Sequence, residues 1–173
     1  MPPFRSVAAL CLSLAFVAFP VGLSGCSTGP TIPGTEISDT PESRAILQVV
    51  ERFRVAFLAR DTATLLSVTH PTYLDNSGTD DPGDDVTYDD LGELLRSRFS
   101  QLDSIRFTID YLDLHVHGDR ATVKVWLDAS FRFKPILAPN GSTRPQAPYS
   151  RKQDHSEFTL LRDEDTWRMT SGI

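Results

Sequence analysis

The spacing of apolar residues changes once along this chain, and that change restricts the fold more than any other feature. Up to Leu102 the apolar residues recur every three or four positions, which predicts amphipathic helices. From Ile105 onward they recur at every second position, which predicts strands with one buried face. Because the helices come first and the strands follow in one run, the sequence predicts an α+β fold with a meander of antiparallel strands.

Three helices are expected before the change of spacing. The first begins at Thr40-Pro41, an N-cap hydroxyl followed by proline at the first helical position. Asp61 is the expected N-cap of a second, short helix that ends near Val68, and Thr87 is the expected N-cap of the third. The apolar face of the first helix consists of Ala45, Ile46, Val49, Val50, Phe53, Ala56 and Phe57.

The alternation in the strand region is interrupted once. From Ile105 to Tyr111 the odd positions are apolar, whereas from Leu112 to Val116 the even positions are apolar. A change of phase inside one strand predicts a β-bulge or a sharp bend at that point. A turn at Gly118-Asp119 then leads into a long strand that alternates without interruption from Ala121 to Phe133. Two more strands are expected at about residues 152–161 and 166–171.

The N-terminal segment has the layout of a secretory signal. A short basic start precedes an apolar run from Val7 to Phe19, which is too short to span a bilayer comfortably. Leu23-Ser24-Gly25-Cys26 then resembles the bacterial lipobox, in which the cysteine is acylated and becomes the first mature residue. We expect residues 1–25 to be a lipoprotein signal peptide and Cys26 to carry the lipid. The alternative is a plain secretory signal with an incidental cysteine.

The segment after this cysteine predicts a linker. Residues 26–40 are rich in Gly, Pro, Ser and Thr, and Ile32 and Ile37 are their only larger apolar residues. This composition favours a flexible tether between the lipid and a single domain over residues 41–173. Ser27, rather than Asp, follows the cysteine, and resemblance to lipoprotein sorting signals implies the periplasmic side of the outer membrane in a cell that has one.

Charge and cysteine content exclude several classes of function. The chain has a net charge of −6, which becomes −7 when the signal segment and its Arg5 are removed. An acidic surface argues against nucleic acid as a partner, and it leaves attachment to the bacterial cell envelope to the lipid itself. No cysteine follows Cys26, so disulfides within the domain and cysteine nucleophiles are excluded. No Gly-rich phosphate loop or dinucleotide motif is present, and no cofactor is expected.

Three short sequences occur in a characteristic order around the bent strand: Phe57-Leu58-Ala59-Arg60-Asp61, His70-Pro71-Thr72-Tyr73 and Asp165-Thr166-Trp167-Arg168-Met169. Residues 42–173 thereby resemble the nuclear transport factor 2-like superfamily, which includes polyketide-cyclase-like and ketosteroid-isomerase-like proteins. The resemblance implies a strongly curved antiparallel sheet that wraps around the first helix as a cone with an apolar pocket. The pocket residues implied are Phe53, Tyr73, Phe99, Phe107, Tyr111, Phe131 and Trp167. This superfamily contains enzymes, ligand binders and interaction domains, so the fold alone leaves the function open.

The resemblance also implies two candidate catalytic carboxylates. Asp75 corresponds to a proton-transferring base, and Asp154 lies near the place of an acid that donates to a developing oxyanion. An apolar cone raises the pKa of a carboxyl group, which suits proton abstraction next to a carbonyl. However, Phe53 stands where the isomerase-like enzymes present a tyrosine hydroxyl, so one oxyanion donor is missing. The alternative is that Asp75 begins a solvated acidic loop that extends to Asp90.

Two other groups of residues suggest binding. The carboxylates of that loop could hold calcium, although they lack the glycine and closing glutamate of a calcium loop. His115 and His117 share one strand face and could chelate a metal with a third ligand, or simply be exposed residues beside a turn. We predict no metal site. The loop carboxylates are Asp75, Asp80, Asp81, Asp84, Asp85, Asp89 and Asp90.

Trp126 suggests a partner. It lies on the polar side of the long strand, where a large aromatic residue favours contact with a second subunit or another envelope protein. The alternative is packing against Thr159 or Leu161 of the neighbouring strand.

These observations predict a lipid-anchored envelope protein whose single domain binds a small apolar ligand or another envelope protein without catalysis. The alternative is a proton-transfer enzyme, an isomerase, cyclase or dehydratase, with Asp75 as its base. The enzyme requires Asp75 inside the cone opposite a second polar group, whereas a binding domain requires an apolar interior.

Overall fold

Three helices precede a four-stranded antiparallel sheet, as the spacing of apolar residues predicts. The structure is a computed structural model and describes residues 29–76, 81–135 and 148–172. The helices are α1 (Pro41–Ala59), α2 (Thr62–Ser67) and α3 (Tyr88–Gln101). The main sheet has the order β3-β4-β5-β6, with strands Leu102–His117, Arg120–Phe133, Tyr149–Asp163 and Thr166–Ser171. Two short strands, β1 (Leu74–Asp75) and β2 (Val86–Thr87), pair with each other.

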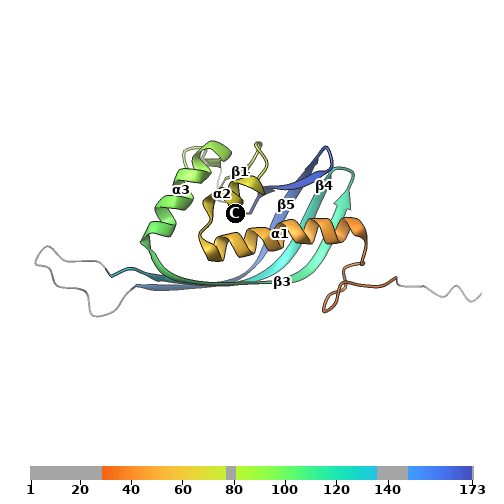
Figure 1. The fold of residues 1–173 in the computed structure, drawn as a ribbon, viewed down its shortest axis with the longest axis horizontal. Helices are drawn as coiled ribbons and strands as arrows, with labels where there is room; N and C mark the ends of the chain where they lie inside the picture. Colours follow the sequence, from red (N-terminus) through yellow and green to blue (C-terminus); the bar gives the residue numbers. More distant parts are fainter. Residues whose placement is uncertain (1–28, 77–80, 136–147, 173) are drawn as a thin grey trace, which may run out of the picture.

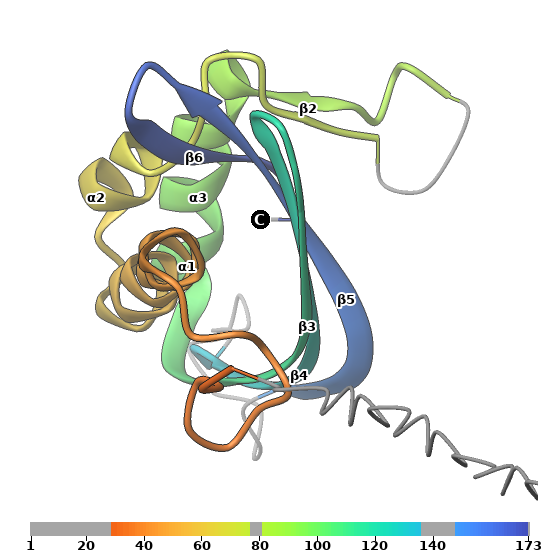
Figure 2. The same ribbon diagram turned by 90° about the vertical axis from the view of Figure 1, so that its right-hand side faces the viewer.

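The main sheet curves around the helices. Figure 1 shows β3, β4 and β5 as a bowed layer beneath α1. Figure 2 shows all three helices on the concave side of that layer. The ring of Phe53 on α1 lies 6.0 Å from that of Phe107 on β3 and 5.6 Å from that of Phe158 on β5, measured between centroids. The predicted α+β cone around the first helix is therefore confirmed.

The helix ends follow from their capping residues. The Thr40 hydroxyl accepts a hydrogen bond of 3.0 Å from the backbone N–H of Ser43 and so caps α1. Arg60 ends α1 in the left-handed conformation, with φ at 58°. Asp61 accepts a 3.0 Å bond from the N–H of Thr64 and starts α2. Thr87 precedes α3, and its backbone N–H and its hydroxyl both donate to the Asp90 carboxylate as a capping box. All three predicted N-caps are thus correct.

The interrupted alternation in β3 is a β-bulge. The register between β3 and β4 shifts between Tyr111 and Asp113, so Leu112 is an extra residue. Beyond the bulge, Leu114 pairs with the fully buried Val123. The extra residue allows both halves of β3 to direct apolar side chains toward the helices.

The segment before α1 packs on the domain in its described part. An isolated bridge joins Thr31 to Ser38, Ile37 is only 5% exposed, and Ile32 contacts the core. This differs from the flexible tether predicted over residues 26–40, because the two isoleucines provide apolar anchors. The predicted signal peptide and Cys26 lie outside the described residues. No helix of the described ranges is long and apolar enough to cross a membrane.

Candidate functional site

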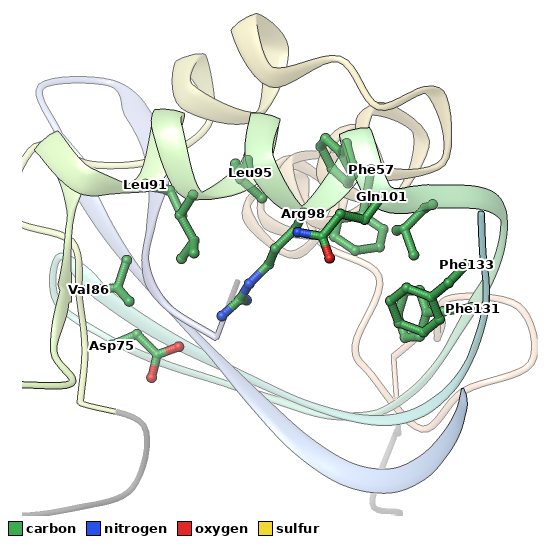
Figure 3. A pocket seen from close by; sticks show the side chains of 12 residues that line it. Phe57, Asp75, Val86, Leu91, Leu95, Arg98, Gln101, Phe131 and Phe133 are labelled. Carbon is green, nitrogen blue, oxygen red and sulfur yellow. The ribbon is translucent and has the colours of Figure 1, made fainter. Parts of the chain in front are cut away.

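An apolar cavity of about 410 Å³ lies between α3 and the sheet. Small-molecule pockets in proteins commonly have volumes of about 300–1,000 Å³, so the cavity is large enough for a small ligand. Figure 3 shows its lining side chains, which come from the helices α1 and α3 and from the strands β1, β2, β3 and β4. Most of its apolar wall is formed by Phe57, Leu91, Leu95, Phe99, Phe131 and Phe133.

The register of α3 explains the composition of the cavity wall. Leu91, Leu95 and Phe99 recur every four residues and are buried. Arg98 follows Leu95 by three positions, so it shares that face and also lines the cavity. In Figure 3 the Arg98 side chain extends from α3 toward the side of the cavity where Asp75 lies. An apolar wall with a cation and a carboxylate at one end suits a ligand with an apolar body and one polar end.

Asp75 lies on the wall of the cavity. It ends β1, pairs with Val86 of β2 and is half-buried. Its side chain lines the cavity together with Arg98 and Gln101. Asp75 thus borders the cavity from the short β1–β2 pair and remains partly exposed, so it meets the first condition for the enzyme alternative only in part.

Asp154 does not join Asp75 in this site. It is absent from the residues that line the cavity, and 58% of its side chain is exposed. Its carboxylate lies 3.9 Å from the ammonium group of Lys152. Phe53 is 2% exposed and packs against other phenylalanines. It has no hydroxyl to donate from that position of α1. The pair of carboxylates implied by the resemblance is therefore not assembled.

The predicted pocket aromatics divide into two groups. Phe99 and Phe131 line the cavity. The other five pack in or against the core: Phe53, Tyr73, Phe107, Tyr111 and Trp167. The polar residues Arg98 and Gln101 were missed by sequence reasoning. The signal for Arg98 was its place on the apolar face of the third helix.

Tyr111 packs against the core and does not line the cavity. Its hydroxyl is buried and has no hydrogen-bond partner in the described part of the chain. Burial, with a smaller contribution from Glu51, raises the pKa of Tyr111 to about 12, and Arg54 opposes this shift. Tyr111 is not among the lining residues, so it is not placed to donate to a ligand there.

The candidate metal ligands remain apart. Nε2 of His115 lies 2.8 Å from a carboxylate oxygen of Asp113, and both side chains are largely exposed. His117 is exposed beside the β3–β4 turn. No group of three His, Cys, Asp or Glu side chains that could hold a metal occurs within the described residues, and Asp80 of the acidic loop lies outside them.

Trp126 lies on the face of the sheet that points away from the helices. It pairs with Asp110 of β3 and His155 of β5, and its ring stands edge-to-face on that of His155 with 4.8 Å between centroids. Its cross-strand neighbour is thus His155 and not Thr159 or Leu161. Trp126 remains partly exposed.

Comparison with known proteins relates this chain to a fold. No family model matches the chain. No curated protein matches it either. A protein from Novosphingobium aromaticivorans, provisionally named a scytalone dehydratase, is 14% identical with a TM-score of 0.59, over 75% of this chain and 79% of its own. A ketosteroid isomerase-like protein from Erwinia carotovora is 15% identical with a TM-score of 0.56, over 76% and 93%.

A third structure, from Streptomyces avermitilis, is described as a member of the NTF2-like family and provisionally named a dehydratase. It is 15% identical with a TM-score of 0.53, over 74% of this chain and 91% of its own. Identities this low relate the folds and not the activities. The protein therefore has the cone-shaped α+β fold of the nuclear transport factor 2-like proteins.

Proposed function

We propose that the domain binds a small ligand with an apolar body in the cavity between α3 and the sheet, without catalysis. The observation that carries the proposal is the cavity itself, about 410 Å³ with walls of leucine and phenylalanine. Transfer of apolar surface from water contributes about 25 cal/mol per Å² of area, so an apolar ligand gains affinity over most of this wall.

A cavity-filling substitution tests this proposal. The full-length chain is placed in nanodiscs and titrated with the uncharged fluorophore N-phenyl-1-naphthylamine, with empty nanodiscs as the blank. Leu94 lines the cavity and is only half-buried, so Leu94→Trp should fill the space with little strain and reduce binding at least tenfold. Val55 is 51% exposed on α1, and Val55→Trp is the matched control. Equal binding by both variants would contradict the proposal.

The same proposal places the domain at the cell envelope through a lipid on Cys26. Its support is the sequence Leu23-Ser24-Gly25-Cys26 after an apolar segment, and the location that follows is the periplasmic side of the outer membrane in a cell that has one. Mass spectrometry of the mature N-terminal peptide should find a lipid-modified cysteine as residue 1. Cys26→Ser should release the protein from the membrane fraction. An unmodified wild-type N-terminus in the soluble fraction would refute the anchor.

A second candidate function is proton transfer with Asp75 as the base. It is favoured by the position of Asp75 on the cavity wall, with Arg98 directed toward it. The test is incorporation of solvent deuterium next to the carbonyl of a cyclic enone, with wild type and Asp75→Asn. Incorporation that depends on Asp75 would establish the enzyme. Deuterium incorporation no faster with either protein than without protein, with fluorophore binding retained, would support the non-catalytic function.

The face around Trp126 is the candidate contact with a second copy or another envelope protein. Its support is the partly exposed Trp126–His155 pair on the outer face of the sheet. Sedimentation of the full-length chain should give a dimer that Trp126→Ser dissociates. A monomer for both proteins would remove the second copy as the partner.

A further inference from the structure

A second hollow, of about 480 Å³, lies across β3, β4 and β5, and its walls are polar. Its residues on β4 are Asp128, Ser130 and Arg132. They alternate with Ala129 and Phe131, which pack in or against the core, so the hollow lies on the opposite face of the sheet from the apolar cavity. We call it the outer groove.

Strand pairing brings three arginines into the outer groove. Ser130 of β4 pairs with Arg106 on β3 and with Arg151 on β5. Arg132 lies two residues beyond Ser130 on the same face of β4, and it too lines the groove. Diagonal neighbours on adjacent strands are about 7–8 Å apart, which long side chains can bridge. The guanidinium groups of Arg106 and Arg132 can therefore both contact the same chemical group of one bound ligand.

Among the described residues, two of these three arginines form no ion pair with a carboxylate. Arg151 donates to Asp128 through Nε at 3.0 Å and a terminal nitrogen at 2.6 Å, so its charge is paired. Within the described ranges, Arg106 and Arg132 take part in no ion pair or hydrogen bond of their side chains. In a chain with a net charge of −6, this groove is a local concentration of positive charge.

The remaining lining residues fit a hydrogen-bonding site. Ser104, Thr108 and Ser130 also line the groove, and their short side chains bring hydroxyl groups to it, of which that of Thr108 already donates to the backbone oxygen of Asp128 at 3.5 Å. Tyr149, which is 60% exposed, stands at the rim. Guanidinium groups bind phosphate oxygens through paired N–H···O bonds, and hydroxyl groups can add further bonds.

We propose that the outer groove binds a phosphate monoester, held between Arg106 and Arg132 with hydroxyl contacts from Ser104 and Ser130. The site is separate from the apolar cavity and does not depend on the function proposed for it. The same phosphate chemistry occurs in small soluble esters and in phospholipid headgroups, and the experiment below distinguishes these two sources.

The test is calorimetric titration of the full-length chain in a neutral maltoside detergent, with the detergent alone as the blank. The ligands are inorganic phosphate, glycerol 3-phosphate and the short-chain lipid dihexanoyl phosphatidic acid. Arg106→Gln and Arg132→Gln should each weaken binding about tenfold or more, because each removes hydrogen bonds to a charged group. Tighter binding of the lipid would assign the source to a headgroup, and equal or tighter binding of glycerol 3-phosphate would assign it to a soluble ester.

Arg120→Gln is the matched control, because Arg120 lies on the same strand and the same face as Arg132 but outside the groove. It should bind phosphate as the wild type does. Circular dichroism checks that every variant is folded. The proposal fails if no ligand saturates the wild-type protein, or if Arg120→Gln weakens binding as much as Arg106→Gln and Arg132→Gln, since the attraction would then be unspecific.

Discussion

Truncation of Phe158 on β5 is the sharpest test of how the sheet packs on α1. Its side chain is fully buried, and its ring lies 5.6 Å from that of Phe53 between centroids. Phe158 also pairs with Val123, which is itself fully buried. Phe158→Ala leaves a hole enclosed by these neighbours, so it should lower the free energy of unfolding by about 3–5 kcal/mol.

Phe131 on β4 provides the matched comparison. It faces the same side of the sheet but is half-buried and borders the apolar cavity. Its ring contacts Phe57 with centroids 6.4 Å apart. Phe131→Ala extends an existing space instead of opening a new one, so it should lose mainly the transfer free energy of a half-buried side chain, about 1–2 kcal/mol.

Urea unfolding of the full-length wild type and both variants, followed by circular dichroism, measures these differences. The slope of free energy against urea should stay constant, since the surface exposed on unfolding changes little. A loss below about 1 kcal/mol for Phe158→Ala would mean that the inner face of β5 is assigned to the wrong set of residues. Equal losses for the two variants would mean that Phe131 does not border open space.

Two further predictions concern single groups with unusual surroundings. Gly172 has φ at +94°, and an added Cβ would lie 2.7 Å from Cδ1 of Phe158. Gly172→Ala should therefore cost about 2–4 kcal/mol in urea unfolding, and a neutral effect would contradict this geometry. The pKa of Tyr111 is raised to about 12, so the folded protein keeps its proton where the unfolded chain loses it. The contribution of Tyr111 to the free energy of unfolding should be constant below pH about 10 and should be lost as the pH rises to about 12. Tyr111→Phe should make the loss of stability in this pH range smaller, without lowering stability at pH 7. A steeper fall in that variant would contradict the assignment.

Local rules in the sequence were sufficient for the elements of the fold. The Thr40 hydroxyl and the Asp61 carboxylate fixed the starts of α1 and α2, because each accepts a hydrogen bond from a backbone N–H that has no partner within its own helix. The change of phase after Tyr111 located the bulge at Leu112, because the alternation of apolar and polar residues is also a local property of the sequence.

The cavity depends on contacts between segments that are far apart in the sequence, and local patterns do not predict such contacts. Phe53 and Phe99 both lie on apolar helix faces and both are buried, yet Phe99, whose ring packs 5.4 Å from that of Phe57, also borders the cavity, and Phe53 does not. The difference arises from the placement of α3 opposite β4 across the cavity, which no local pattern encodes. The position of Asp75 is likewise set by a non-local contact, the pairing of β1 with β2, in which Asp75 lies opposite Val86.

The choice between binding and proton transfer depends on what lies opposite Asp75. Proton abstraction next to a carbonyl needs a donor about 3 Å from the oxygen that gains negative charge. Phe53 has no hydroxyl and Asp154 lies outside the cavity, so among the lining residues this donor has to be Arg98 or Gln101. Both extend from the exposed edge of α3, where water competes for their hydrogen bonds and weakens the stabilisation of an oxyanion. The same side chains need no such exclusion of water to hold the polar end of a bound ligand, so the arrangement favours binding.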